Sequence, residues 1–307
     1  MSTTVTLPRR TRIDLLAATL LTLLCLAWGV QQVAIKVAIT HGLPPVFQAA
    51  LRSVIAVVCV CAWEAARGEL RGLLRRDGAF RLGMLAGLLF GAEFVAMFAG
   101  LARTSAERGV IVLYTAPFFV AAGAHLLIAG ERMRARQWLG LLLAFAAVAS
   151  VEAGASRNGG GGIAGDAMVL AGAVLWAATS LLVKGTRLAR LPAAKVVLYQ
   201  LAGSVPVLFA CSALAGESWS LHGVAPVAWW ALLYQGAGVA GASYLVWFWL
   251  MARYPVSRIS AFTFLTPVFG VLAAALLLGD AVTPAVVLAL VGVAVGLRLI
   301  NARPVEG

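Results

Sequence analysis

The sequence is poor in charged residues. They make up 12% of the 307 residues, whereas soluble domains carry roughly 25%. Hydrophobic residues make up 62% of the chain, and a soluble fold of this length could not bury that much apolar surface. The scarcity of charge therefore excludes an ordinary soluble domain and predicts an integral membrane protein.

Residue types that build active sites are also scarce or badly spaced. The three histidines lie far apart, and the four cysteines lie in apolar runs without a second thiol or a histidine at metal-ligand spacing. The cysteines are therefore expected to be small buried hydrophobic residues. A phosphate-binding Gly-Lys-Ser/Thr motif is absent, so we do not expect ATP hydrolysis. We predict no enzyme, no catalytic residue, no metal site and no cofactor.

What the chain has in place of these is a series of ten apolar stretches of near-spanning length, roughly 17–25 residues. They predict an all-α integral membrane fold with short connections and no soluble domain. The basic start is interpreted as leading into the first helix, since no Ala-x-Ala-like cleavage site follows it. The expected spans are 13–34, 44–64, 80–101, 107–129, 135–153, 165–185, 193–214, 226–250, 256–278 and 283–300.

The chain repeats itself at an offset of 148–150 residues. The matched pairs are Trp28 with Trp176, Lys36 with Lys184, Arg103 with Arg253, Arg108 with Arg258, Pro117 with Pro267, Phe119 with Phe269 and Glu131 with Asp280. The repetition predicts a first five-helix repeat over 1–153, a flexible glycine-rich joint over 154–162, and a second five-helix repeat over 163–307. Because five is odd, the second repeat would enter the membrane from the opposite side. Two inverted-topology repeats of this kind predict alternating access around a central site.

Basic residues are distributed unevenly over the predicted connections. With the amino terminus in the cytoplasm, 19 of the 24 Lys and Arg residues fall on the cytoplasmic side, four on the other side, and Arg52 inside a helix. This positive-inside pattern predicts that both termini are cytoplasmic. Nucleic-acid binding is the other reading of a basic chain, but the charges are scattered over loops without a binding module.

Short motifs recur in order along the chain. They are Ala27-Trp28-Gly29, Ala49-x-x-Arg52, Thr104-Ser105-Ala106, Gly130-Glu131-Arg132, Gly165-Asp166, Phe264-Leu265-Thr266-Pro267-Val268-Phe269 and Leu278-Gly279-Asp280. In this order and spacing the chain resembles the drug/metabolite transporter superfamily, specifically its ten-helix EamA branch, over nearly its whole length. Asp280 departs mildly from the glutamate usual in that family. The resemblance implies export of amino acids, other metabolites or drugs, and aromatic amino acid exporters are one subgroup.

Two charged residues are expected deep in the membrane. An ionised carboxylate at the position of Glu93 costs roughly 2.5–3.5 kcal/mol, so it must face a cavity or a partner. Gly83, Gly87 and Gly91 form a small-residue stripe for helix packing, and at 100° per residue Glu93 points away from it, on the face of Phe90 and Met97. Arg52, at similar depth, would bind a substrate carboxylate or pair with Glu93. A purely structural ion pair is the alternative.

Further polar and aromatic residues are expected around these two charges. Ser243 matches Glu93 in the second repeat and Gln200 matches Arg52. We expect the substrate site to include, besides these four residues, Trp28, Gln31, Gln32, Trp176, Tyr199 and Tyr244. Aromatic faces with a few hydrogen-bonding groups suit a small amphipathic solute, although packing or lipid-facing aromatic residues remain the alternative.

Four residues near helix ends or breaks carry further expectations. Pro117 and Pro267 each remove a backbone donor, so they are predicted to kink the same helix of each repeat and help its ends open and close. Glu131 and Asp280 end their helices, where an acid is unfavourable to the helix dipole. Each is therefore expected to pair with a basic neighbour or with the start of another helix.

Together these features predict a secondary transporter that exports amino acids or related small metabolites across a bacterial inner membrane. Arg52 or Gln200 would hold a carboxylate, Glu93 an ammonium group, and aromatic rings the side chain. Proton coupling through Glu93 and facilitated movement both stay open. The alternatives are an exporter of lipophilic drugs and a non-transporting sensor or scaffold. The expected partners are a small-molecule substrate and the lipid bilayer, with no nucleic acid, and a monomer would suffice.

Overall fold

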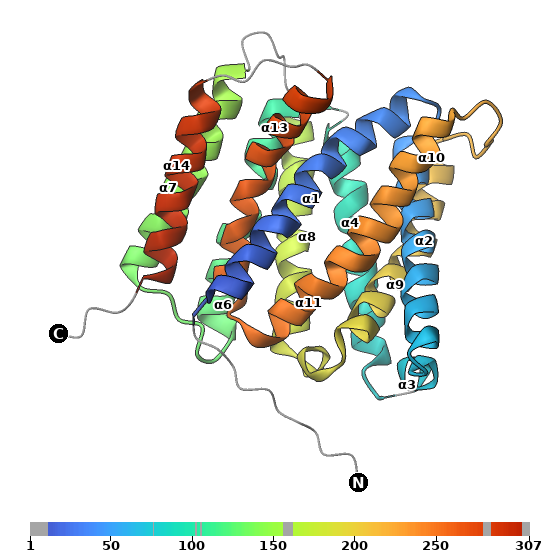
Figure 1. The fold of residues 1–307 in the computed structure, drawn as a ribbon, viewed down its shortest axis with the longest axis horizontal. Coiled ribbons are helices and arrows are strands. Elements are labelled where there is room, and N and C mark those ends of the chain that lie inside the picture. The colour runs from blue at the N-terminus through green and yellow to red at the C-terminus, as the bar shows by residue number, and fades with distance from the viewer. Residues whose placement is uncertain are drawn as a thin grey trace.

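The computed structural model describes residues 12–75, 77–101, 103–104, 106–155, 162–278 and 284–302, and that part of the chain is helical without strands (Figure 1). The first half contains α1 (Leu15–Thr40), α2 (Pro45–Ala66), α3 (Leu70–Leu74), α4 (Phe80–Leu101), α5 (Ala106–Leu113), α6 (Ala116–Leu127) and α7 (Ala135–Ala155). The second half contains α8 (Ile163–Gly185), η1 (Arg187–Arg190), α9 (Ala193–Leu214), α10 (Pro226–Leu233), η2 (Tyr234–Ser243), α11 (Tyr244–Arg253), α12 (Val256–Ala261), η3 (Phe262–Phe264), α13 (Leu265–Leu278) and α14 (Pro284–Asn301).

Seven helical segments in the described part of the chain are long and apolar enough to cross a membrane. They are Leu15–Thr40, Pro45–Ala66, Phe80–Gly100, Gly109–Leu127, Ile163–Gly185, Ala193–Leu214 and Val256–Leu277, and the shorter apolar helices Ala135–Ser150 and Val286–Asn301 accompany them. Helices satisfy every backbone polar group within one segment, which is what a bilayer requires. The predicted all-helical membrane protein is therefore confirmed at this level.

Three of the predicted spans are not continuous α-helices. The span predicted at 107–129 divides into α5 and α6, and the span at 256–278 contains the 3₁₀ turn η3 between α12 and α13. Each interruption comes just before a proline, Pro117 or Pro267, which cannot donate to the preceding turn. The span predicted at 226–250 contains the π-helical η2, a wider helical form that is often found at functional sites.

Helices from the two halves pack against each other rather than forming separate bundles. The main pairs are α4 with α8 and α9, α2 with α9, α1 with α13 and α10, and α7 with α14. Figure 1 shows α7 and α14 together at one edge and α1 running beside α10 and α11. The predicted joint at 154–162 falls largely outside the described residues.

The contact between α4 and α9 depends on the predicted small-residue stripe. A Cβ atom on Gly87 would lie 2.6 Å from the Cα atom of Gly203, and one on Gly83 would lie 2.4 Å from the ring of Tyr199. Gly91 faces Val207 in the same way, so the expected packing face is confirmed. Glu93 consequently turns toward the other side of α4.

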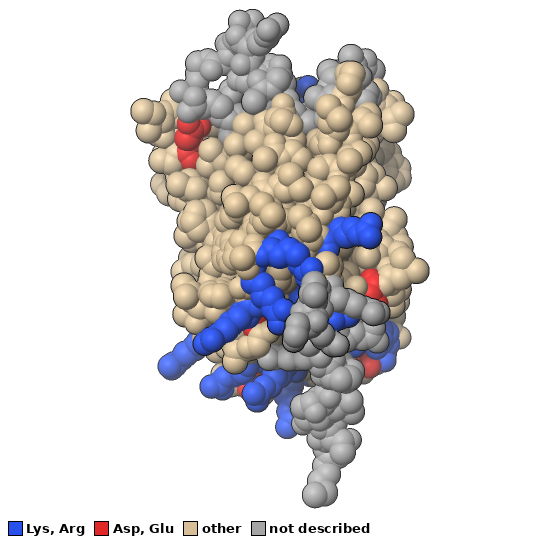
Figure 2. All heavy atoms as spheres, turned by 90° about the vertical axis from the view of Figure 1, so that its left-hand side faces the viewer, with Lys and Arg blue, Asp and Glu red and all other residues tan. Residues whose placement is uncertain are grey.

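The two ends of the molecule differ in charge. Lys and Arg side chains gather toward the lower end in Figure 2, the end at which α3 lies in Figure 1. We call this the basic end. Exposed arginines of the connections there include Arg67, Arg71, Arg75, Arg132, Arg134, Arg187 and Arg190.

Candidate functional site

A central cavity lies between helices of both halves. It contains about 950 Å³ of space between side chains, open solvent at its mouth included. Its lining residues are Trp28, Gln31, Gln32, Ile35, Phe90, Glu93, Phe94, Met97, Leu113, Tyr114, Trp176, Thr179, Ser180, Gln200, Tyr244, Trp247, Phe248, Met251 and Thr266.

Seven of the ten residues predicted to bind substrate line this cavity: Trp28, Gln31, Gln32, Glu93, Trp176, Gln200 and Tyr244. Phe90 and Met97 also line it, on the helix face that the spacing from Glu93 indicated. Phe94, Trp247 and Phe248 are lining residues that the sequence did not single out, because apolar side chains carry no local signal that separates a cavity wall from ordinary packing.

Glu93 is the one charged residue in the described cavity wall. Only 8% of this residue is exposed, and its Oε2 atom has no hydrogen-bond partner. One other lining oxygen, Oε1 of Gln200, is likewise buried without a partner. Buried polar groups in proteins are nearly always hydrogen-bonded. Two residues of this cavity wall therefore carry an unpaired polar oxygen.

Arg52 does not line the cavity, contrary to the expectation that it would reach the substrate. It is 1% exposed, and its guanidinium carbon lies 4.1 Å from the centroid of the Phe94 ring, which does line the cavity. Glu93 and Tyr244 are the groups with which Arg52 interacts electrostatically. Stacking on an aromatic face stabilises a desolvated guanidinium. The two predicted charges thus interact electrostatically, and the ring of Phe94 lies against the guanidinium.

Ser243 also lies outside the wall and orients a residue within it. Its hydroxyl accepts a hydrogen bond from Nε1 of Trp28 at 2.9 Å and donates to the carbonyl oxygen of Val239 at 2.6 Å. The Trp28 ring meets the rings of Trp247 and Tyr244 edge-on, with centroids 5.2 Å and 6.4 Å apart. This serine therefore fixes one aromatic side of the cavity rather than presenting a group to the solute.

Tyr199, which was also predicted to bind substrate, does not line the cavity. Its hydroxyl donates to Oδ1 of Asp77 at 3.1 Å. Adjacent positions on a helix point about 100° apart. Gln200 therefore faces the cavity, while the ring of Tyr199 packs against Gly83 of α4. Burial tends to raise the pKa of the Asp77 carboxyl, but hydrogen bonds from Ala79, Lys195 and Tyr199 and the charge of Lys195 hold that pKa below its ordinary value.

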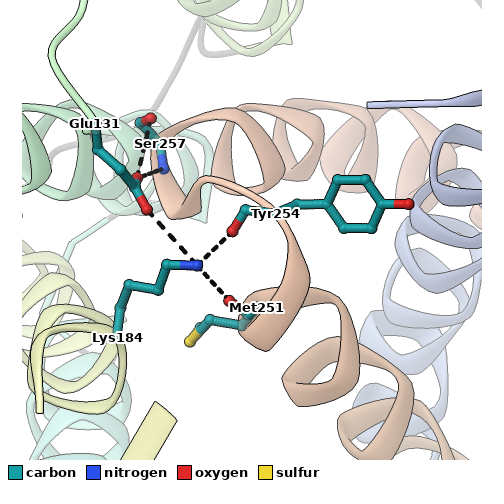
Figure 3. A network of polar contacts seen from close by, with 5 residues as sticks. All are labelled: Glu131, Lys184, Met251, Tyr254 and Ser257. Atoms are coloured by element: carbon teal, nitrogen blue, oxygen red, sulfur yellow. Dashed lines mark hydrogen bonds and ion pairs between the residues drawn. The ribbon is translucent and has the colours of Figure 1, made fainter. Parts of the chain in front are cut away.

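A network of polar contacts lies at the ends of α6, α8 and α11 (Figure 3). The Nζ atom of Lys184 donates to the carbonyl oxygens of Met251 and Tyr254, both at 2.6 Å, and lies 3.7 Å from Oε1 of Glu131. Oε2 of Glu131 accepts from the backbone nitrogen and the hydroxyl of Ser257 at 3.3 Å and 3.4 Å.

Both partners expected for Glu131 are present, a basic residue and the start of a helix, α12. Its predicted counterpart Asp280 lies outside the described residues. Lys184 is 4% exposed and lies in the last turn of α8.

Known proteins resemble this chain over almost its whole length. The sequence profile described as the EamA-like transporter family matches residues 15–152 and again residues 163–302. A protein of Salmonella typhimurium named "Probable amino-acid metabolite efflux pump" is 31% identical over 271 residues, which cover 85% of this chain and 86% of the relative. A protein of the same name from Escherichia coli is 28% identical over 270 residues, covering 85% and 86%.

Two further comparisons agree with these. A protein of Bacillus subtilis named "Uncharacterized transporter YvbV" is 27% identical over 290 residues, covering 93% of this chain and 92% of the relative. A crystal structure with 23% sequence identity superposes with a TM-score of 0.81 over 96% of this chain and 100% of the other, a likeness of fold alone. The named relatives are transporters and efflux pumps, not enzymes.

Proposed function

Because this chain belongs to the EamA-like transporter family, we propose that it is a secondary transporter that exports amino acids or related small metabolites. The observation that carries the proposal is the central cavity, in which a single carboxylate, Glu93, lies among aromatic rings and amides. A mostly apolar cavity with a few convergent polar groups suits a small solute. The names of the Salmonella and Escherichia relatives point to the same substrate class.

The pairing of helices supports two inverted repeats and alternating access. When the halves are matched at the sequence offset, α1 corresponds to α8, α4 to the α10–η2–α11 segment, and α6 to α13. The contacts of α8 with α4 and α6 then mirror those of α1 with α10 and α13. Contacts of α2 with α9 and of α7 with α14 join matching helices. Halves related in this way can exchange conformations around the cavity between them.

The cavity chemistry favours a substrate with an ammonium group and an apolar or aromatic body. We assign the ammonium to Glu93, whose Oε2 atom lacks a partner, and the side chain to the rings of Trp28 and Trp176. A carboxylate would bind the amide of Gln200. Phe94 separates Arg52 from the solute, so Arg52 would balance the charge of Glu93 and would not clamp the carboxylate.

The placement of charge supports insertion with the basic end in the cytoplasm. Cytoplasmic connections of membrane proteins carry an excess of Lys and Arg, and these residues gather at the basic end (Figure 2). The described chain begins and finishes its helices, at Leu15 of α1 and Asn301 of α14, toward this end. Both termini would then be cytoplasmic and the membrane would be the bacterial inner membrane.

An exporter of lipophilic compounds is the competing function, and the number of aromatic rings in the wall favours it. The two functions differ in the need for charge on the solute. Efflux of labelled tryptophan from proteoliposomes, with competitors of one ring system, separates them. Amino acid export predicts competition by tryptophan and by tryptamine, which keeps the ammonium, and weak competition by indole-3-propionate, which lacks it. Equal competition by unsubstituted indole would instead support transport of neutral lipophilic solutes.

A further inference from the structure

We propose that the ion pair between Lys184 and Glu131 is the barrier that closes the central cavity toward the basic end. A solute would cross to that end only when this pair separates. The inference rests on the proposed transport function for its physiological meaning, but the barrier itself can be tested without any transport.

Residues of the network line two different pockets. The Met251 residue lines the central cavity, and its carbonyl oxygen is held by Lys184. On the other side, Lys184, Glu131 and Tyr254 line a second pocket of about 860 Å³, open solvent included, together with Arg253. Lys184 and its partners therefore stand between the cavity and a basic vestibule at the end of the molecule.

The pair holds the junction between α11 and α12 from both sides. Lys184 binds the last carbonyl oxygens of α11, and Glu131 binds the first turn of α12 at Ser257. Lys residues at a helix C-terminus and acids at a helix N-terminus are each favourable to the helix dipole. Met251 belongs to α11 and lines the cavity, so loss of these contacts would allow this part of the cavity wall to move.

The pair also joins the two halves of the chain. Glu131 follows α6 in the first half, whereas Lys184, Met251, Tyr254 and Ser257 all belong to the second half. Removal of one charge leaves the other buried and uncompensated, which is strongly unfavourable. The ion pair therefore has two states. It is formed when the halves are together at the basic end, and it is lost when the halves separate and water hydrates both charges.

A pair that only stabilises the fold is the alternative. The lysine at the matching position of the first half provides a control. Lys36 occupies the corresponding place in α1, toward the opposite end, and is exposed. A change at Lys36 removes the same charge from the matching position without touching the barrier.

The test measures access to the cavity from each side of the membrane. The reporter is Ser180→Cys, at a buried position of the cavity wall on α8. It is introduced into a protein in which Cys59, Cys61 and Cys211 are changed to serine. The new thiol is then labelled with a membrane-impermeant maleimide. Cys25 is left in place because it is 1% exposed. The same variant without the cysteine at 180 gives the background, and vesicles of both orientations separate the two faces.

We expect Glu131→Gln to raise the labelling rate from the basic end at least about tenfold, a shift in population that a small free-energy difference produces. Lys36→Met should leave that rate unchanged, and Glu131→Asp should restore most of the protection. If Glu131→Gln alone does not fold, the double variant Glu131→Gln with Lys184→Met, which leaves no unpaired charge, gives the same readout.

The barrier and the transport function can fail separately. Unchanged labelling from the basic end in folded Glu131→Gln and in the double variant would overturn the barrier and leave a structural pair. Increased labelling in a protein whose wild type moves no solute in proteoliposomes would uphold the barrier while contradicting the proposed function. In the transporting protein, loss of the barrier should change the maximal rate of efflux and leave KM for substrate nearly unchanged.

Discussion

Lys36 and Lys184 occupy matching positions in the two halves of one chain, yet their surroundings are opposite. Lys36 is exposed near the end of α1, whereas Lys184 is 4% exposed and bound to Glu131, Met251 and Tyr254. The same residue in the same repeat position therefore makes different contacts at the two ends. The difference shows that a buried ion pair joins the two halves at Lys184 and that Lys36 is exposed in the matching position.

Glu93 and Ser243 differ in the same manner at the centre. Glu93 presents an unpartnered carboxylate oxygen to the cavity from α4. Ser243, at the matching position, ends the π-helical η2 and uses its hydroxyl to orient Trp28. Both halves supply aromatic rings to the cavity wall, but only the first half supplies a charge to it.

Replacement of the buried lysine should have the largest effect on stability. Lys184→Met leaves Glu131 charged and buried, which costs about 3–5 kcal/mol. Lys36→Met should leave the unfolding midpoint unchanged, since its side chain is exposed. Thermal unfolding of the two variants in detergent makes the comparison. A similar drop for both would mean that burial does not distinguish the two lysines.

Neutralising the central carboxylate should weaken substrate binding. Loss of a charge-assisted contact to an ammonium group lowers affinity by roughly ten- to a hundredfold, about 1.4–2.8 kcal/mol. Glu93→Gln should therefore raise KM for a labelled amino acid, measured by efflux from proteoliposomes. The glutamine side chain keeps the shape and a hydrogen-bonding group, so an unchanged KM would show that the charge of Glu93 does not contact the substrate.

The matching change in the second half should have a smaller effect. Ser243→Ala removes the acceptor of the Trp28 indole at 2.9 Å, and hydrogen bonds inside membrane proteins contribute about 0.6 kcal/mol on average. We expect a two- to fourfold rise in KM, a loss of about 0.4–0.8 kcal/mol, with no change in the pH dependence of transport. An effect as large as that of Glu93→Gln would mean that Ser243 contacts the solute directly.

A small effect on stability is also expected at the basic end, at Asp77. The folded-state pKa of this carboxyl is lowered, so its contribution to stability is full above its ordinary pKa and is lost as pH falls through the lowered value. Asp77→Asn should cost at most about 1 kcal/mol at neutral pH, given exposure to solvent. Unfolding midpoints of the variant and the parent should converge below about pH 4. A gap that persists at low pH would show that the carboxylate charge is not involved.

Sequence patterns predicted most of the helices and the position of the cavity. Long apolar runs decide where a bilayer-spanning helix can lie, and the spacing from the glycine stripe decided which face of α4 Glu93 takes. The sequence pattern could not predict the surroundings of Arg52, because its guanidinium packs against the ring of Phe94, which belongs to another helix. It also could not show that Tyr199 bonds to Asp77, since this contact depends on how distant segments of the chain pack.

The helix interruptions were only partly foreseeable. Pro117 and Pro267 indicated where regular helix would fail, and α5 and η3 end just before them. The π-helical η2 contains no proline, and it packs against α1 and α2. Whether the two proline breaks act in gating stays a prediction.

A solute that crosses the membrane through the cavity that Glu93 lines should show counterflow. Proteoliposomes are loaded with unlabelled tryptophan, diluted into a trace of labelled tryptophan, and sampled for uptake. We expect transient accumulation of label by the wild type, a much smaller accumulation by Glu93→Gln, and none by protein-free liposomes. Uptake by wild-type vesicles that equals that of protein-free liposomes, repeated across a panel of labelled amino acids and amines, would contradict it.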